Sequence, residues 1–222
     1  MAEAAISLKR VKVTRSDRIL VLERIIRELA PQDVLELGAG DYSFDYVAEP
    51  SRRSWTKVDC AEPCDVIYDF NQQRVRLPFA AASLDLVICT EVLEHLMWPQ
   101  ALLAEAHRLL RPGAHVLISV PNAVSLTYRV GWMFGHIPSC AACGNLSFGP
   151  TAYVTETGET IAGHVIDFSV SRLKTLLRQT GFEVERMTGG GLYRKFRIAP
   201  HWMLPASLSS NLICLARRVD LP

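Results

Sequence analysis

Two glycines and one acid, gathered at a single turn, are the residues of this sequence with the clearest chemical meaning. The segment Val34–Asp41 reads as a buried strand that runs into a turn containing Gly38 and Gly40, with Glu36 just before it. A strand, a tight turn and then a helix present backbone N–H groups to a nucleotide-like ligand at the carboxyl end of a sheet. The glycines permit positive φ angles and the close approach of a ligand. We therefore expect a ligand site at this turn.

The charge of Glu36 narrows the choice of ligand. A carboxylate beside the site repels phosphate groups, but it suits a ligand that is cationic or that carries hydroxyl groups. This charge points away from ATP and NAD and toward S-adenosylmethionine.

Further acids stand where the next two predicted strands end. Asp59 ends the second strand, and a carboxylate there can accept two hydrogen bonds from ribose hydroxyls. Asp69 ends the third strand, where it can accept from an adenine amino group while Phe70 covers the ring. Each acid also has a simpler interpretation: a capping or salt-bridge role for Glu36, a turn for Asp59, and a strand end with a core aromatic for Asp69 and Phe70.

The remaining motifs follow in a fixed order. They are Leu77–Phe79, Ser83–Val87, Thr90–His95, Arg108–Gly113 and Ser119–Asn122. The whole set resembles the class I S-adenosylmethionine-dependent methyltransferases, in particular the small-molecule branch related to ubiquinone and menaquinone methyltransferases. The resemblance is strong over residues 33–122 and looser over residues 164–217.

This resemblance implies S-adenosylmethionine as the cofactor and methyl transfer to a small molecule, on oxygen in preference to carbon or nitrogen. It also implies the binding residues: Glu36, Gly38, Ala39 and Gly40 for the methionine part, Asp59 with Cys60 beside it for ribose, Asp69 and Phe70 for adenine, and Thr90 and Glu91 at the methyl-transfer site.

An oxygen nucleophile with a high pKa also needs a base. His164 is the first candidate, because it opens the later motif and lies near Asp167 in the sequence, and Glu91 is the second. Other candidates are His136, Tyr153, His95 and His201, although His95 is better interpreted as a structural, hydrogen-bonding residue.

The elements that must position these residues alternate along the chain. Strands are predicted near 33–37, 54–58, 65–68, 84–89 and 115–120, and helices or helical turns near 16–29, 43–48, 99–110 and 170–180. This alternation predicts an α/β fold with a doubly wound, mainly parallel, Rossmann-like sheet. Glu183–Thr188 and Leu212–Ala216 are expected to form an antiparallel hairpin at its edge. Residues 122–165 fit no regular element, which suggests a lid or insertion.

The length, charge and hydrophobic pattern of the chain limit its domain organisation, its partners and its location. With 222 residues we expect a single domain over 1–222, with a cofactor half at about 31–122, a lid and substrate region at about 122–165, and a C-terminal helix and strands at 166–217. The 24 basic and 23 acidic residues create no overall field that would attract nucleic acid. No apolar run of 18 residues and no signal peptide are visible, so we expect no membrane span, a cytoplasmic location and free thiols.

Several alternatives stay open at this level. The same cofactor could serve a protein or another macromolecular acceptor, or the fold could persist as a non-catalytic scaffold. A NAD-dependent dehydrogenase would need a third glycine where the chain has Tyr42, Ser43 and Phe44.

Metal binding is a separate question. Cys140 and Cys143 have the spacing of a zinc knuckle, and His136 and His164 could complete a set of four ligands. Because no second pair of cysteines has this spacing, we expect no metal.

Overall fold

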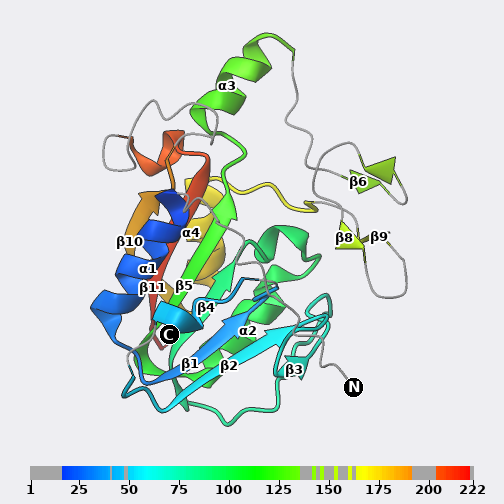
Figure 1. Cartoon of the computed structure of the whole chain (residues 1–222). Helices are drawn as coiled ribbons and strands as arrows, with labels where there is room; N and C mark the ends of the chain where they lie inside the picture. The colour runs from blue at the N-terminus through cyan, green and yellow to red at the C-terminus, as the bar shows by residue number, and fades with distance from the viewer. Residues whose placement is uncertain are drawn as a thin grey trace, which may run out of the picture.

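The computed structural model describes residues 17–40, 42–47, 50–135, 164–191 and 204–220, together with the backbone of four two-residue strands between 142 and 161. Its centre is one seven-stranded sheet with the strand order β10-β11-β5-β4-β1-β2-β3 (Figure 1). The strands are β1 Asp33–Leu37, β2 Ser54–Asp59, β3 Val66–Ile67, β4 Leu84–Thr90, β5 Leu110–Pro121, β10 Phe182–Gly189 and β11 Asn211–Arg218. β1 to β5 pair in parallel, whereas β11 is antiparallel to both of its neighbours. The mainly parallel sheet and the antiparallel C-terminal pair are therefore confirmed.

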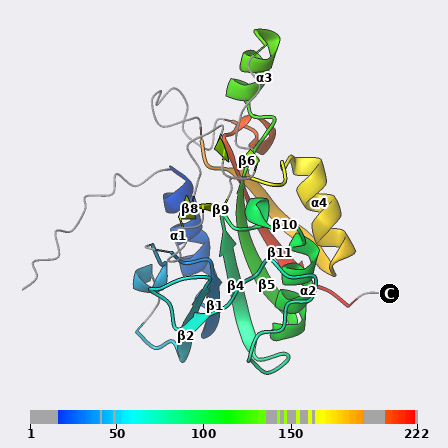
Figure 2. The same cartoon turned by 90° about the vertical axis from the view of Figure 1, so that its right-hand side faces the viewer.

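Helices cover both faces of the sheet. α1 Asp17–Leu29 lies on one side, and α2 Pro99–Leu109 and α4 Val170–Gln179 lie on the other (Figure 2). This is the three-layer arrangement that strand–helix alternation predicts. Within the part of the chain that the structure describes, no helix has both the length and the apolar character needed to cross a membrane.

The strand β4 shows how one strand serves two cores. Leu86 and Ile88 pack in the cluster beneath α1, whereas Val87 and Cys89 belong to the cluster beneath α2 and α4. Successive side chains of a strand point to opposite faces, so a strand covered on both faces must be apolar throughout. That is why the run Leu84–Cys89 lacks polar alternation, apart from Asp85.

The two residues predicted to begin and end the helix α4 are confirmed by the structure. The Ser169 side chain accepts a hydrogen bond from the Arg172 backbone N–H at 3.3 Å, which is an N-cap. Gly181 follows the helix with φ +85°, the left-handed conformation that ends many helices. These two residues fix where the chain enters and leaves α4.

Two segments differ from the expectation. β5 begins at Leu110, five residues before the predicted start, because a register shift opposite β4 accommodates the Pro112–Gly113 pair within the strand. The predicted irregular segment 122–165 contains a helix, α3 Leu126–Met133, which projects from the end of the sheet in both views (Figure 1, Figure 2). α3 buries none of its side chains, so the periodic apolar stripe by which a helix is recognised is missing.

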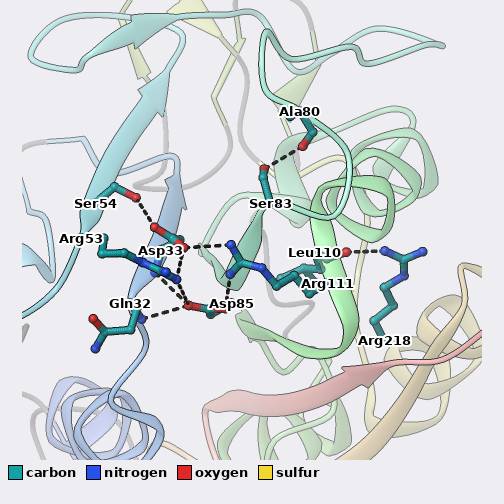
Figure 3. A network of polar contacts seen from close by, with 10 residues as sticks. All are labelled: Gln32, Asp33, Arg53, Ser54, Ala80, Ser83, Asp85, Leu110, Arg111 and Arg218. Atoms are coloured by element: carbon teal, nitrogen blue, oxygen red, sulfur yellow. Dashed lines mark hydrogen bonds and ion pairs between the residues drawn. The ribbon is translucent and has the colours of Figure 1, made fainter.

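A polar network joins the amino ends of the parallel strands, opposite the ligand edge (Figure 3). Arg111 at the start of β5 binds both Asp33 of β1, at 2.9 Å, and Asp85 of β4. Arg53 binds Asp33 at 2.5 Å, and the Ser54 hydroxyl donates to the same carboxylate at 3.1 Å. The network holds four strands in register at the end of the sheet that carries no candidate site residue.

Candidate functional site

The turn after β1 is built around two glycines with different surroundings. Gly38 has φ +69°, and a Cβ built on it would lie 2.2 Å from Cγ2 of Val92. Gly40 has φ +50°, and a Cβ on it would meet no atom of the described residues within 4 Å. Gly38 therefore allows the turn to pack against the residues after β4, while Gly40 leaves open space over the turn, which is where a ligand could approach.

Asp59 connects this turn to the end of β2. Its Oδ2 accepts a hydrogen bond from the Gly40 N–H at 2.8 Å, and its Oδ1 accepts from the Cys60 N–H at 2.6 Å. The side chain is half-buried, so lone pairs of both oxygens remain for a ligand. Its predicted role as a ribose ligand stays a prediction, and the geometry is compatible with it.

Asp69 follows two residues after Ile67, the β3 residue that pairs with Asp59 across the sheet. The Tyr68 N–H donates to the Asp59 backbone oxygen at 2.7 Å, which places the following Asp69 beside it. Asp69 is exposed, and its carboxylate accepts from the Asn71 N–H at 2.8 Å. Phe70, by contrast, is only 5% exposed and packs in the core, so in this structure it has the core role that the simpler interpretation assigned to it.

Glu36 is directed inward. The carboxylate is 1% exposed and accepts hydrogen bonds from the Ser43 hydroxyl at 2.6 Å, the Phe44 N–H at 3.0 Å and Trp55 Nε1 at 2.8 Å. Burial raises its pKa, and these three donors oppose that rise. Glu36 thus anchors the loop after Gly40, as the capping interpretation held, and a direct contact with a cofactor stays a prediction. Ala39 is also buried, and its predicted contact with the cofactor stays a prediction.

The turn after β4 carries a second polar group. β4 ends at Thr90, and Glu91 follows with φ +56°, an unusual conformation for a residue other than glycine. The Glu91 N–H donates to the Ser119 backbone oxygen at 2.8 Å, and this bond holds the turn in place. Strained backbone of this kind gathers at ligand sites.

The Glu91 carboxylate binds three residues, of which Arg18 and Asn211 belong to none of the sequence motifs. It accepts from the Ser119 hydroxyl at 2.8 Å and from Asn211 Nδ2 at 3.2 Å, and it lies 3.3 Å from the Arg18 guanidinium. These partners come from β5, β11 and α1. No local pattern could have shown that they converge, although Ser119 lies in one of the recognised motifs.

His164 lies in the segment that leads to α4, on the same edge of the sheet. It is half-buried, and it lines a small open pocket beyond the end of β5. The other lining residues are Pro121, Ala123, Tyr128, Ile166, Asp167 and Phe168. Burial lowers the pKa of His164, and the negative charges of Glu91 and Asp167 oppose this. Of the other predicted bases, His136 and His201 lie outside the described residues, as does the Tyr153 side chain.

Comparison with known proteins identifies the family. The protein family described as "Methyltransferase domain" matches residues 14–186, which is most of the chain. The chain belongs to this methyltransferase domain family.

A curated relative of this methyltransferase domain is a probable S-adenosylmethionine-dependent methyltransferase of Mycolicibacterium smegmatis, 35% identical over 117 residues. The match covers 49% of this chain and 45% of that protein, so the chain spans about half the length of this relative. A relative from Mycobacterium tuberculosis has the same description and is 31% identical over 118 residues, covering 49% of this chain and 42% of that protein. The predicted cofactor, S-adenosylmethionine, agrees with both descriptions.

Solved structures share the fold. A methyltransferase of Mesorhizobium loti has a TM-score of 0.58 at 16% identity, over 91% of this chain and 98% of that one. The N-methyltransferase NodS of Bradyrhizobium japonicum, solved with S-adenosyl-L-homocysteine, has a TM-score of 0.53 at 11% identity, over 93% and 90%. At these identities the likeness concerns the fold alone. The quinone branch of the family stays a prediction.

Proposed function

We propose that this chain is an S-adenosylmethionine-dependent methyltransferase that acts on a small molecule with an oxygen nucleophile. The observation that carries the choice of acceptor is the pocket beside His164. Apolar groups of Pro121, Ile166 and Phe168 form much of its lining, with a few polar groups among them. A mostly apolar, open hollow with a few polar groups suits part of a compact organic acceptor.

The cofactor side is supported by the turn after β1. When bound, S-adenosylmethionine supplies a methyl group on a positively charged sulfur. Open space over Gly40 gives the ligand room, and Asp59 and Asp69 offer acceptor oxygens at the same edge. Two carboxylates suit the hydroxyl and amino groups of an adenosyl compound, and they disfavour the pyrophosphate of NAD.

The residues of the chain then have two tasks. The first is to hold the nucleophile close to the methyl carbon and in line with the bond that breaks, which is worth about 7–11 kcal/mol in well-oriented reactions. The second is to handle the proton of the acceptor hydroxyl, for which His164 lines the pocket. Glu91 is held by Arg18, Ser119 and Asn211, and it therefore positions the turn after β4.

Calorimetric titration tests the cofactor. We expect saturable binding of S-adenosylmethionine and S-adenosylhomocysteine and none of NAD. Binding of NAD in their place would overturn the cofactor assignment.

A transfer assay tests the acceptor. The protein is incubated with methyl-labelled S-adenosylmethionine and matched panels of phenols, carboxylic acids and amines, and with a macromolecular fraction of cell extract. We expect label in hydroxylated small molecules. Label confined to amines or to the macromolecular fraction would overturn the proposed acceptor.

A further inference from the structure

A partly buried cluster of three metal-ligating side chains lies beside the acceptor pocket. Glu94 and His95 belong to the short helix η2 Leu93–His95 that follows β4, and His164 comes from the segment before α4. The Glu94 backbone oxygen accepts hydrogen bonds from the Val165 N–H at 2.7 Å and the Ile166 N–H at 3.1 Å. These two bonds bring His164 to η2, although about 70 residues separate them in the chain.

The side chains of this cluster converge. One ligand atom each of Glu94, His95 and His164 lies within 4.8 Å of the other two. His95 Nε2 is 3.9 Å from Glu94 Oε1, and the two imidazole rings are 5.0 Å apart, centroid to centroid, at 71°. Bonds of about 2.0–2.2 Å in a tetrahedral site place ligand atoms roughly 3.3–3.6 Å apart, so small side-chain rotations would close the set around an ion.

The Glu94 carboxylate gives an independent indication of a missing partner. Its side chain is 1% exposed, and neither oxygen has a hydrogen-bond partner among the residues that the structure describes. Burial and the nearby Glu91 raise the pKa of Glu94 well above its usual range, and the nearby backbone N–H of Glu94 itself and the charge of Arg18 oppose this rise only partly. Buried carboxylates are normally paired, hydrogen-bonded or bound to a metal, because an isolated buried charge is costly.

We propose that Glu94, His95 and His164 bind a divalent transition-metal ion of the zinc and cobalt class. Two imidazoles and one carboxylate favour such an ion over magnesium and calcium, which prefer oxygen ligands alone. Three protein ligands leave at least one coordination position open, as in catalytic rather than structural sites. Because His164 also lines the acceptor pocket, an ion held by this cluster would lie beside the place where we expect the substrate to bind.

The role of this ion rests on the proposed function, whereas its binding does not. A divalent cation lowers the pKa of a bound hydroxyl group. The acceptor would lose its proton to solvent, its oxygen would form the new bond to the methyl carbon, and the carbon–sulfur bond would break with its electron pair remaining on sulfur. His164 would then act as a ligand, and the cation would replace it as the group that activates the acceptor.

Titration of the chelator-treated 222-residue chain with Co²⁺ and Zn²⁺ tests the site. The background variant carries Cys140→Ser and Cys143→Ser, so that the two cysteines with zinc-knuckle spacing cannot contribute ligands. We expect one saturable Co²⁺ site with a visible absorption band, and displacement of Co²⁺ by Zn²⁺ but not by Mg²⁺.

Variants identify the ligands. Glu94→Gln keeps the shape of the side chain and should weaken Co²⁺ binding by more than about 100-fold, because even residues that only support ligands are typically worth 10–100-fold. His164→Asn should do the same. Glu183→Gln, which changes an exposed acid of β10, should bind Co²⁺ like the parent.

Three results would overturn the metal site: no saturable binding in the background variant, unchanged affinity in Glu94→Gln, or unchanged affinity in His164→Asn. Thermal unfolding without metal checks that each variant is folded, and His164→Asn serves if Glu94→Gln is not. Because cobalt binding is measured without an acceptor, a failure of methyl transfer would contradict the proposed function and leave the metal site intact.

Discussion

The Gly40 amide nitrogen lies 2.8 Å from Asp59 Oδ2, so the turn after β1 and the end of β2 share one hydrogen bond. The acid that we expect to bind ribose therefore also shapes the glycine turn that we expect to hold the methionine part. Two neighbouring strands of a parallel sheet supply the two halves of the site. A change at either residue should affect the binding of the whole cofactor.

Asp59→Ala should weaken S-adenosylhomocysteine binding by about 1.5–3 kcal/mol, the typical contribution of a hydrogen bond to a charged group. Calorimetry at constant pH measures it. Asp65→Ala is the matched control, because Asp65 accepts from the Lys57 N–H at 2.8 Å and lies before β3 rather than at the ligand edge. Equal affinity of Asp59→Ala and the parent would show that the ribose assignment is wrong.

The glycines at positions 38 and 40 should respond differently to alanine. Gly38→Ala combines a positive φ with the contact to Val92, and overpacking of this kind typically costs 1–3 kcal/mol of unfolding free energy. Gly40→Ala meets only the backbone penalty, about 1–2 kcal/mol, but places a methyl group in the open space over the turn. Urea unfolding should therefore show the larger loss for Gly38→Ala.

Titration of Gly40→Ala with S-adenosylhomocysteine tests whether the space over this turn belongs to the cofactor site. If Gly40→Ala binds S-adenosylhomocysteine as tightly as the parent, the open space over the turn is not part of the ligand site.

Cys60 should react slowly with alkylating reagents at neutral pH although it is exposed. Partial desolvation, the hydrogen bond to Asp59 and the charges of Asp59 and Asp69 raise the pKa of its thiol to about 11. The thiolate is the nucleophile, so the rate should rise with pH up to about that value. Asp59→Asn should shift the profile to lower pH. The rate is measured by mass spectrometry of the peptide that contains Cys60, and an unshifted profile in Asp59→Asn would contradict the cause given.

Asp33 should make stability depend on pH in the acid range. Burial raises the pKa of its carboxyl, but the hydrogen bonds from Arg111 and Ser54 and the charge of Arg53 outweigh this and leave it below its usual value. A carboxyl whose pKa is lower in the folded state stabilises the fold above the pKa of the unfolded state, about 3.9, and this contribution is lost as pH falls through the lower folded value.

The variant Asp33→Asn tests this dependence. At pH 7 its free energy of unfolding should be lower than that of the parent by about 1.5–3 kcal/mol, the range for hydrogen bonds to charged groups. The difference between parent and variant in urea unfolding should be constant above about pH 5 and shrink below about pH 4. Glu183→Gln, which changes an exposed acid of β10, is the control. Its free energy of unfolding should differ little from that of the parent in both pH ranges. A difference for Asp33→Asn that stays constant down to pH 3 would be incompatible with the ion pairs drawn in Figure 3.

Local patterns in the sequence determined most of the sheet. The apolar run of β4, the N-cap Ser169 and the glycine turn after β1 depend on residues a few positions apart, so each can be recognised without knowing its neighbours in space. The acids Asp59 and Asp69 could be placed at one edge for the same reason, because parallel strands end together. α3 escaped prediction because it buries no face.

The tertiary structure alone decided how the remaining polar groups are used. Trp55, 19 residues along the chain, and Ser43 determine that Glu36 is directed inward. The meeting of Glu94 with His164 depends on backbone hydrogen bonds between segments that no periodicity connects. Sequence shows which face or end of an element a residue occupies, because strand and helix geometry are local. It does not show which distant group fills the space opposite, because that follows from the packing of the whole chain.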